Sequence, residues 1–152
     1  MSEYKLKELL NQKHYTLCSA ESLTGGGFSY FITRHPGAST YFKGGMVTYA
    51  NEIKLRLGVT ANTLDKYGAV SEQCAKEMVE RVQEFFKTDV AISFTGNAGP
   101  DAMENKPVGL VYIGIRIKDK TYVYKNIFDG DRELIRSQCI FFGVNQIQEL
   151  LK

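Results

Sequence analysis

The sequence predicts an α/β sandwich whose sheet is mixed and mostly parallel, with one antiparallel strand. Short apolar runs of strand length alternate with segments whose apolar residues recur at helical spacing. A strand hairpin follows this alternation and precedes the last helical segment. The chain has 152 residues, the usual size of one domain, so we expect residues 1–152 to form a single domain.

The first half of the chain supplies helices and strands in turn. Pro36 and Gly37 end the second helix, because neither residue continues a helix well. The expected elements are a helix containing Leu6, Leu9 and Leu10, a strand at 16–20, a helix at 28–33, a strand at 45–50, a helix capped by Asn51 that ends at Gly58, and a short helix capped by Thr60 that ends near Gly68.

The second half begins with the clearest helix of the chain. Ser71 starts this helix, and Glu72 lies in the first turn, where the helix dipole favours a carboxylate. Apolar residues then recur at helical spacing as far as Phe86. The remaining expected elements are a buried strand at 90–93, a loop from 95 to 107, a hairpin of strands 108–117 and 122–128 joined through 118–120, and a helix at 131–151.

The composition is that of a globular protein, with 43% apolar and 24% charged residues, which excludes disordered, collagen-like and coiled-coil classes. The net charge of +2 argues against nucleic acid as the main partner, because such proteins usually carry a concentrated basic field. The sequence has no apolar run near the roughly 20 residues of a membrane span and begins without the apolar core of a signal peptide. We therefore expect a cytoplasmic protein with no membrane partner.

Cysteine and histidine usage narrows the possible chemistry. Cys18, Cys74 and Cys139 are odd in number, widely spaced and placed in apolar runs, which predicts buried free thiols and suits a reducing compartment. The two histidines, His14 and His35, lie in polar, turn-like surroundings and are expected at the surface. Two histidines make a His-based triad or a multi-histidine metal site hard to build.

Two glycine-rich segments, 22–27 and 95–99, each follow a buried strand directly. In open α/β sheets ligands bind beyond the carboxyl ends of the strands, and amides beside glycines and at helix N-termini favour anions. Both loops are therefore candidates for one anionic ligand. For either loop alone, a tight turn with left-handed glycines is the simpler interpretation. Neither loop matches a Walker sequence or the full dinucleotide fingerprint.

A serine activated by a lysine is a nucleophile and base pair that needs no histidine. Ser22 directly follows a strand, and Ser39 follows the forced turn at Pro36. Lys54 is the candidate base, because it lies in the first turn of a helix, where the dipole disfavours a cation. From the residues alone, a helix cap for Ser39 and a solvated surface lysine for Lys54 are the simpler interpretations.

Arg132 and Arg136 lie four residues apart near the start of the last helix and share one face. Together they can clamp a phosphate or a carboxylate. A solvated face paired with the neighbouring carboxylates Asp129, Asp131 or Glu133 is an equally good interpretation.

Taken together and in this order, seven segments resemble the CinA C-terminal domain family, whose enzymatic members are nicotinamide-nucleotide amidohydrolases (nicotinamide mononucleotide deamidases). The resemblance runs from about residue 4 to residue 151. Larger family members carry an extra N-terminal domain, and we expect this chain to be the stand-alone form. The matching segments are AESLTGG at 20–26, PGASTYFKGGMVTYANEIK at 36–54, LGV at 57–59, GAVSE at 68–72, TGNAGP at 95–100, KPVGLVYIGI at 106–115 and FDGDRELIR at 128–136.

The resemblance implies a three-layer α/β/α fold. It also implies hydrolysis of the carboxamide of nicotinamide mononucleotide to nicotinic acid mononucleotide and ammonia, in the recycling of pyridine nucleotides. No metal or organic cofactor is implied, and the implied partners are a small-molecule nucleotide and a second copy of the chain. The family is described as using a Ser/Lys dyad. Carried over by motif, the nucleophile falls on Ser39 and the base on Lys54, with Ser22 as the alternative nucleophile.

The resemblance further implies residues that support the dyad. Ser22, Tyr49 and Thr95 fall in the same site as supporting hydroxyls, and Arg132 or Arg136 would hold the substrate phosphate. The glycine-rich loops would supply amides for the substrate. Their implied binding residues are Thr24, Gly25, Gly26, Gly96 and Gly99.

One segment departs from the family pattern. Family members usually have two glycines and a Thr or Ser where this chain has Ala102, Met103 and Glu104. Alanine and methionine do not freely adopt a positive φ, so we expect this loop to close differently and to bring a carboxylate near a site meant for an anion. The departure favours an alternative function, a catalytically impaired nucleotide-binding or protein-interaction module linked to competence or DNA damage. The intact dyad residues favour an enzyme.

Overall fold

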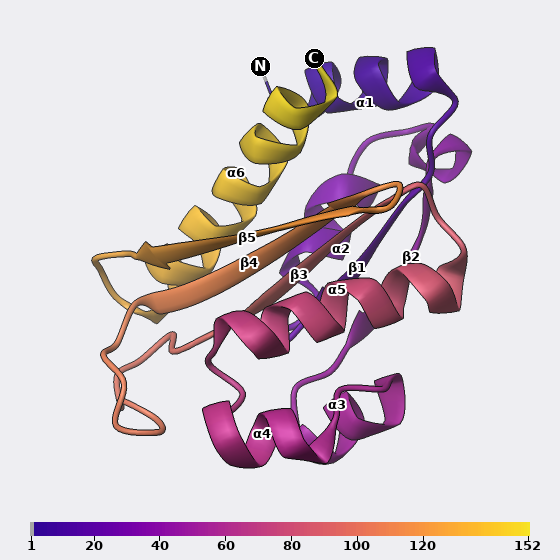
Figure 1. The fold of residues 1–152 in the computed structure, drawn as a ribbon. Coiled ribbons are helices and arrows are strands. Elements are labelled where there is room, and N and C mark those ends of the chain that lie inside the picture. The colour runs from indigo at the N-terminus through magenta and orange to yellow at the C-terminus, as the bar shows by residue number, and fades with distance from the viewer. Residues whose placement is uncertain (1) are drawn as a thin grey trace.

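The computed structural model describes residues 2–152 as one five-stranded sheet between two layers of helices (Figure 1). The α/β sandwich that the sequence predicts is therefore confirmed, with all three layers. The elements in chain order are α1 (Ser2–Lys13), β1 (Leu17–Glu21), α2 (Gly27–Thr33), the 3-10 turn η1 (Ala38–Thr40), β2 (Phe42–Val47), α3 (Asn51–Leu57), α4 (Ala61–Tyr67), α5 (Glu72–Phe86), β3 (Val90–Gly96), β4 (Leu110–Ile117), β5 (Lys120–Ile127) and α6 (Arg132–Leu151).

The sheet has the strand order β2-β1-β3-β4-β5. β1 pairs in parallel with β2 and β3, whereas β4 pairs antiparallel with both of its neighbours. β4 is thus the one strand that runs against the other four, as the sequence predicts. The carboxyl ends of β1, β2 and β3 consequently meet at the same edge of the sheet, where ligands of open α/β sheets bind.

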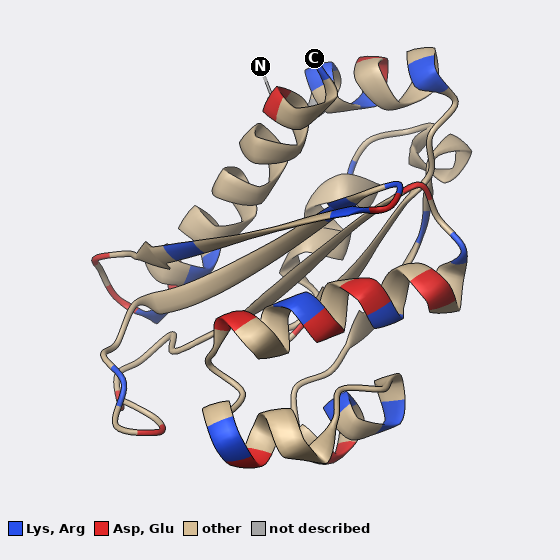
Figure 2. Ribbon diagram, viewed as in Figure 1, with Lys and Arg blue, Asp and Glu red and all other residues tan. Residues whose placement is uncertain are grey.

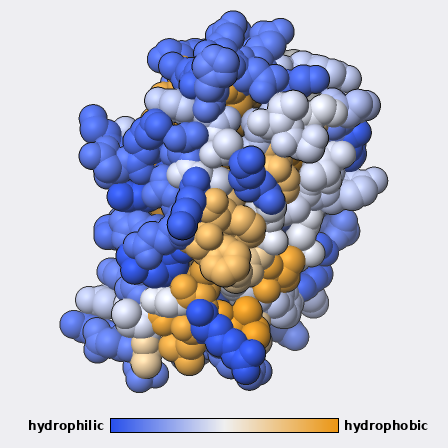
Figure 3. All heavy atoms as spheres, turned by 90° about the vertical axis from the view of Figure 1, so that its right-hand side faces the viewer, coloured by the Kyte–Doolittle hydropathy of each residue, from blue (hydrophilic) through white to orange (hydrophobic). Residues whose placement is uncertain are grey.

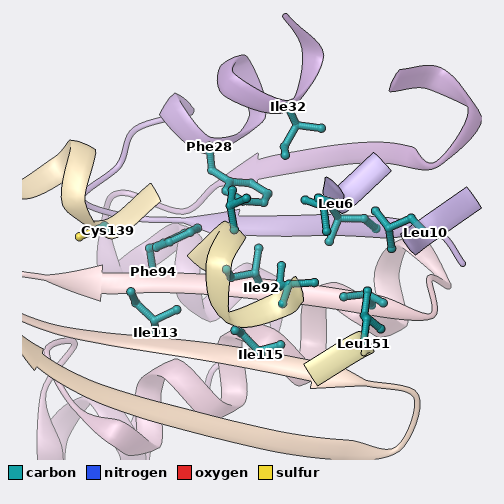
Figure 4. Packing of buried hydrophobic residues seen from close by; sticks show 14 of the residues in the cluster. Leu6, Leu10, Phe28, Ile32, Ile92, Phe94, Ile113, Ile115, Cys139 and Leu151 are labelled. Carbon is teal, nitrogen blue, oxygen red and sulfur yellow. The ribbon is translucent and has the colours of Figure 1, made fainter. Parts of the chain in front are cut away.

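Apolar side chains fill the space on both faces of the sheet. On one face α1, α2 and α6 cover Ile92, Phe94 and Ile113 (Figure 4). Gly143 lets α6 lie close to the sheet, because a Cβ there would come within 2.6 Å of the Ile92 side chain. On the other face α5 packs Met78 and its neighbours against β1 and β3. The strands carry few charged residues, and the helices and loops carry most of them (Figure 2).

The cysteines are buried and free, as the sequence predicts. Cys18 of β1 and Cys74 of α5 lie in the core between α5 and the sheet, and Cys139 of α6 lies in the core on the opposite face. Burial raises the pKa of each thiol to about 12. His14 is exposed as expected, whereas His35 is half-buried beside the Tyr4 ring, 4.6 Å away between centroids.

Of the helix caps predicted at Asn51 and Thr60, the cap at Thr60 is confirmed. Thr60 and Ser71 each accept the backbone amide three residues on, as N-cap side chains do. Asn51 is the first residue of α3 and not its cap, which is Ala50. Among the described residues, no helix combines the length and the hydropathy that a membrane span requires.

Strand boundaries differ from the prediction by one or two residues in β1, β4 and β5 and by three in β2 and β3. β2 begins at Phe42, three residues before the predicted strand, and its register with β1 shifts by one residue between Leu17 and Cys18. It ends at Val47, so the carbonyl oxygens of Thr48 and Tyr49 lie beyond the strand. β3 continues to Gly96, so Thr95 and Gly96 end a strand and do not begin a loop.

Candidate active site

Lys54 is buried at the edge of the sheet where β1, β2 and β3 end. It lies in α3 and its side chain is only 2% exposed. Its Nζ lies 2.8 Å from the Thr48 carbonyl oxygen and 2.9 Å from that of Tyr49. The third partner is the Ser22 hydroxyl, with 3.0 Å between Nζ and Oγ. Burial lowers the pKa of Lys54 from its usual value of 10.5, although Cys74 and Glu104 act in the opposite direction.

The three partners of Lys54 decide what its nitrogen can do. A carbonyl oxygen only accepts hydrogen bonds, so the Thr48 and Tyr49 carbonyls each hold one N–H. A neutral amine has two N–H bonds and one lone pair. With both N–H bonds engaged, the lone pair is left for the third partner, the Ser22 hydroxyl. In its neutral form Lys54 can therefore accept the Ser22 proton, whereas as an ammonium it donates its third N–H to Ser22 Oγ.

Ser22 is placed by the end of β1. It directly follows Glu21, the last residue of the strand, and its amide donates to the Phe94 carbonyl of β3 at 2.9 Å. Its side chain is buried. The serine that the sequence offers as the alternative nucleophile is therefore the one that contacts Lys54.

Ser39 lies at the other end of β2. It is exposed on η1, which immediately precedes the strand. The six residues of β2 separate it from Thr48, and an extended strand of that length spans roughly 20 Å. Within residues 2–152, the hydrogen bonds of Lys54 Nζ go to Ser22, Thr48 and Tyr49 and not to Ser39. The expected contact between Ser39 and Lys54 is therefore wrong.

The Ser22–Lys54 pair borders a cavity of about 370 Å³, a size suited to a small ligand. Its walls come from the ends of β1 and β3, from the segment before α3, from residues 69–70 and from the loop after β3. The cavity brings together Ser22, Tyr49, Lys54, Thr95, Gly96, Gly99 and Arg132 among the residues predicted from the sequence.

Arg132 lies at the mouth of this cavity on the first turn of α6. Its Nη1 donates to the Gly99 carbonyl at 2.6 Å and its Nη2 to the Tyr49 hydroxyl at 3.1 Å. The Tyr49 ring is 59% exposed, so ring and guanidinium form one rim that faces solvent. Thr95 is almost fully buried, and its hydroxyl donates to the Ala69 carbonyl at 2.7 Å, which ties residue 69 to β3.

The first glycine loop does not offer a helix N-terminus to a ligand. The buried Glu21 carboxylate accepts the amides of Phe28 at 2.9 Å and Ser29 at 3.0 Å, both in the first turn of α2. It also accepts the Thr24 hydroxyl at 2.8 Å. A carboxylate of the chain itself thus fills the place that an anionic ligand would take.

The other residues of the first glycine loop form the turn between β1 and α2. Gly25 and Gly26 have φ of +57° and +96°, the left-handed region that glycine enters without strain. Thr24, Gly25 and Gly26 are not among the cavity's lining residues. Arg136 points to this loop: its Nη2 donates to the Thr24 carbonyl at 3.1 Å, and its Nη1 pairs with Glu133. Of the two arginines, Arg132 faces the cavity.

The loop after β3 closes on itself and on α4. The Asn97 side chain is buried and donates to the carbonyls of Met103 and Lys106, each at 3.1 Å. The Glu104 carboxylate accepts the amides of Ala69 at 2.8 Å and Val70 at 3.1 Å.

The closed loop pairs two charged side chains and holds two residues at positive φ. Lys106 Nζ lies 3.1 Å from Glu104 Oε1. Burial alone would raise the pKa of Glu104, but the two amides and Lys106 outweigh it and hold the pKa below its usual range. The positive φ angles fall on Glu104 and Asn105 and not on Ala102 or Met103.

Sequence reasoning missed three features of this site. The carbonyls of Thr48 and Tyr49 carry no side-chain signal, and only the early end of β2 frees them. Asn51, which the sequence predicts only as a cap, lines the cavity. Glu104 accepts the backbone amides of Ala69 and Val70, a contact that the sequence does not indicate. Among residues 2–152, no group of three or more His, Cys, Asp or Glu side chains is placed to hold a metal ion.

Residues 2–151 match the family model of the CinA C-terminal domain. The chain belongs to this family. A putative competence-damage inducible protein of Bacillus cytotoxicus is 44% identical over 151 residues, which cover 98% of this chain and 37% of that protein. A protein of the same name from Bacillus subtilis is 46% identical over 142 residues, which cover 93% of this chain and 34% of that protein. This CinA domain thus spans about a third of the length of the curated relatives it matches.

Solved structures of the CinA superfamily share the whole fold. A superfamily protein from Klebsiella pneumoniae superposes with a TM-score of 0.96 at 28% identity, covering 98% of this chain and 94% of that one. One from Escherichia coli superposes with a TM-score of 0.94 at 30% identity, covering 97% and 87%. The family resemblance that the sequence motifs indicate is therefore confirmed.

Proposed function

We propose that this chain hydrolyses the carboxamide of nicotinamide mononucleotide to nicotinic acid mononucleotide and ammonia, with Ser22 as nucleophile and Lys54 as base. One observation carries the proposal: a buried lysine has two of its bonds on carbonyls and its third on a serine hydroxyl that borders a cavity. Membership of the CinA family supports the substrate class. Ser22 replaces Ser39 in the dyad that the family resemblance implies.

The first half of the proposed reaction forms an ester on Ser22. As Ser22 Oγ attacks the carboxamide carbon, its proton passes to the lone pair of Lys54 Nζ. The tetrahedral intermediate then collapses, and the C–N bond breaks as Lys54 returns that proton to the departing nitrogen, which leaves as ammonia. Lys54 is neutral again at the end of this half.

The second half releases the acid. A water molecule attacks the ester carbon and gives one proton to Lys54, and collapse returns this proton to Ser22 as the ester bond breaks. The sum is one amide and one water converted to one carboxylic acid and one ammonia. The proposed reaction needs no metal or organic cofactor, because Lys54 carries each proton in turn.

Substrate binding in this proposal uses the rim of the cavity. Arg132 would hold the phosphate, because its guanidinium is fixed by Gly99 and Tyr49 and faces solvent at the mouth. Backbone amides of the second glycine loop, which border the cavity, would stabilise the oxyanion. The depth of the cavity is left for the ring and its carboxamide beside Ser22.

The proposal is tested by ammonia release from nicotinamide mononucleotide in the presence of EDTA. Wild-type protein should release ammonia despite the chelator, and Lys54→Ala should lose the activity while keeping its melting temperature within a few degrees. Ser39→Ala is the matched control and should turn over normally, because Ser39 lies outside the cavity. No turnover by the wild-type protein, or normal turnover by Lys54→Ala, would overturn the proposed dyad.

A second function is favoured by one specific observation. Glu104 places a carboxylate in the wall of the cavity where family members usually have small residues. A nucleotide-binding or protein-interaction module without catalysis would fit this change, and two relatives carry the name putative competence-damage inducible protein. Saturable binding of nicotinamide mononucleotide without ammonia release would favour this function over the hydrolase.

We further propose that residues 1–152 act in the cytoplasm as one domain that forms a homodimer. Apolar side chains gather on the face that contains edge strand β2 (Figure 3). Val47 of β2, Leu55 of α3 and Phe85 of α5 are apolar residues that are 47%, 43% and 63% exposed. Sedimentation should give a dimer that Phe85→Glu converts to a folded monomer. A wild-type monomer at every concentration would contradict the dimer.

A further inference from the structure

The cavity has charged groups of opposite sign in different walls. Arg132 stands at the mouth, where it is joined to Tyr49 and Gly99. Glu104 lies in the wall made by the loop after β3 and residues 69–70. The loop between β3 and β4 carries charges of both signs near α4 (Figure 2). Lys106, which pairs with Glu104, is not among the residues that line the cavity.

The Glu104 carboxylate is fixed and not a mobile surface charge. Its two oxygens accept the amides of Ala69 and Val70, and its side chain is 28% exposed. Glu104 adopts a φ of +61°, a conformation that costs a glutamate energy and persists only where contacts hold it. Gly68 makes room for it, because a Cβ at residue 68 would overlap Glu104 Oε1.

We propose that Glu104 selects the charge of the ring that enters the cavity, favouring a cationic pyridinium and disfavouring a second carboxylate. This inference rests on the proposed function. Nicotinamide mononucleotide carries a positive ring and a negative phosphate. With the phosphate at Arg132, the ring would share the cavity with Glu104, so the charges of the ligand match those of the walls. The acid product adds a carboxylate, which Glu104 repels.

The charge of Glu104 reaches the residues that would perform the reaction. It acts on Lys54 and opposes the effect of burial on the pKa of that lysine. A charge that acts on the amine beside Ser22 would also act on a ring bound against Ser22, because both border the same cavity. Substrate selection and release of the acid product follow from one fixed charge.

A purely structural role for Glu104 makes a different prediction. If the side chain only staples the loop to residues 69 and 70, then changing its charge alters stability and leaves the ring preference unchanged. Glu104→Gln removes the charge and keeps the size and one acceptor oxygen, but its NH2 group cannot accept the second backbone amide. The melting temperature, measured beside the binding ratios, therefore separates a loss of stability from a change in ring preference. Lys106→Met tests the same charge from the other side, because it removes the cation that partly neutralises Glu104.

The experiment measures binding without turnover, in protein that carries Ser22→Ala. Three probes share one phosphate: nicotinamide mononucleotide with a cationic ring, its reduced dihydro form with a neutral ring, and nicotinic acid mononucleotide with an added carboxylate. We expect the first to bind about tenfold more tightly than either of the others. Glu104→Gln should bring both ratios close to one, and Lys106→Met should increase them. Asp101→Asn, which removes an exposed carboxylate from the same cavity, should keep the ratios.

The outcomes separate this inference from the function on which it rests. Ratios that survive Glu104→Gln, or that Asp101→Asn abolishes equally, overturn the role of Glu104 and leave the proposed hydrolase standing. Binding of none of the three probes overturns both. Ammonia release by the wild-type protein is measured separately, so an inactive enzyme with the expected binding ratios overturns only the hydrolase.

Discussion

The two glycine-rich loops follow adjacent parallel strands and end at the same edge of the sheet, yet they use their backbone amides differently. In the loop after β1, the amides at the start of α2 donate to Glu21, and only Ser22 and Leu23 line the cavity. In the loop after β3, Gly96 and Gly99 line the cavity directly, and Arg132 binds the Gly99 carbonyl. Amides become available to a ligand only where the chain does not supply its own carboxylate.

The sharpest test of this comparison lies within the first loop. Ser22→Ala should lower kcat for ammonia release by about 10³-fold or more, because no other hydroxyl contacts Lys54 among the described residues. Steady-state kinetics would measure it. Thr24→Val should leave kcat near its wild-type value and reduce only stability, because the Thr24 hydroxyl serves Glu21. Equal losses of kcat in both variants would mean that the whole loop contacts the substrate.

Glu21 should matter chiefly for folding. Glu21→Ala removes the acceptor of several buried donors, and we expect a loss of about 3 kcal/mol in the free energy of unfolding. Urea denaturation would measure it. Glu133→Ala is the matched control, because Glu133 is 80% exposed in its ion pair and its loss should cost close to nothing. A small effect of Glu21→Ala would show that solvent satisfies the start of α2.

The two arginines of α6 extend the comparison, because Arg132 binds the loop after β3 and Arg136 binds the loop after β1. Arg132→Met should raise KM for nicotinamide mononucleotide by roughly tenfold to a hundredfold, because a phosphate would lose a charged hydrogen-bond partner. Arg136→Met should change KM little, because its guanidinium is bound to Thr24 and Glu133. The reverse order of effects would place the phosphate beside the first loop.

The pH dependence gives the smallest of these effects. Burial lowers the pKa of Lys54 below 10.5, so the neutral base exists at a lower pH than for a solvated lysine. Activity should therefore rise with pH through that lowered pKa. Between it and 10.5 the unfolded chain holds a proton that the folded chain has lost, so stability should also rise with pH there. Lys54→Met should flatten this rise in urea titrations, and an unchanged slope would contradict a buried titrating lysine.

The pattern of apolar residues predicts the architecture well, because the main helices and strands each have a recognisable local pattern. The helical spacing after Ser71, the apolar strands at β1 and β3 and the terminal hairpin were enough for the α/β sandwich. The candidate site was harder. Lys54 was identified, but its partner was assigned to Ser39 by motif, and the length of β2 separates the two. Backbone carbonyls at Thr48 and Tyr49 and the Glu104 contacts are products of tertiary packing, which no local pattern encodes.

The buried cysteines make the chain its own reporter of unfolding. Each thiol is enclosed and has a pKa of about 12, so alkylating reagents meet almost no thiolate in the folded protein. Cys18 of β1 and Cys74 of α5 lie between α5 and the sheet, whereas Cys139 belongs to α6 on the opposite face. The order in which the three become labelled in dilute denaturant would reveal which helical layer leaves the sheet first. No engineered probe is needed, and opening near Cys74 would also register disturbance around Lys54.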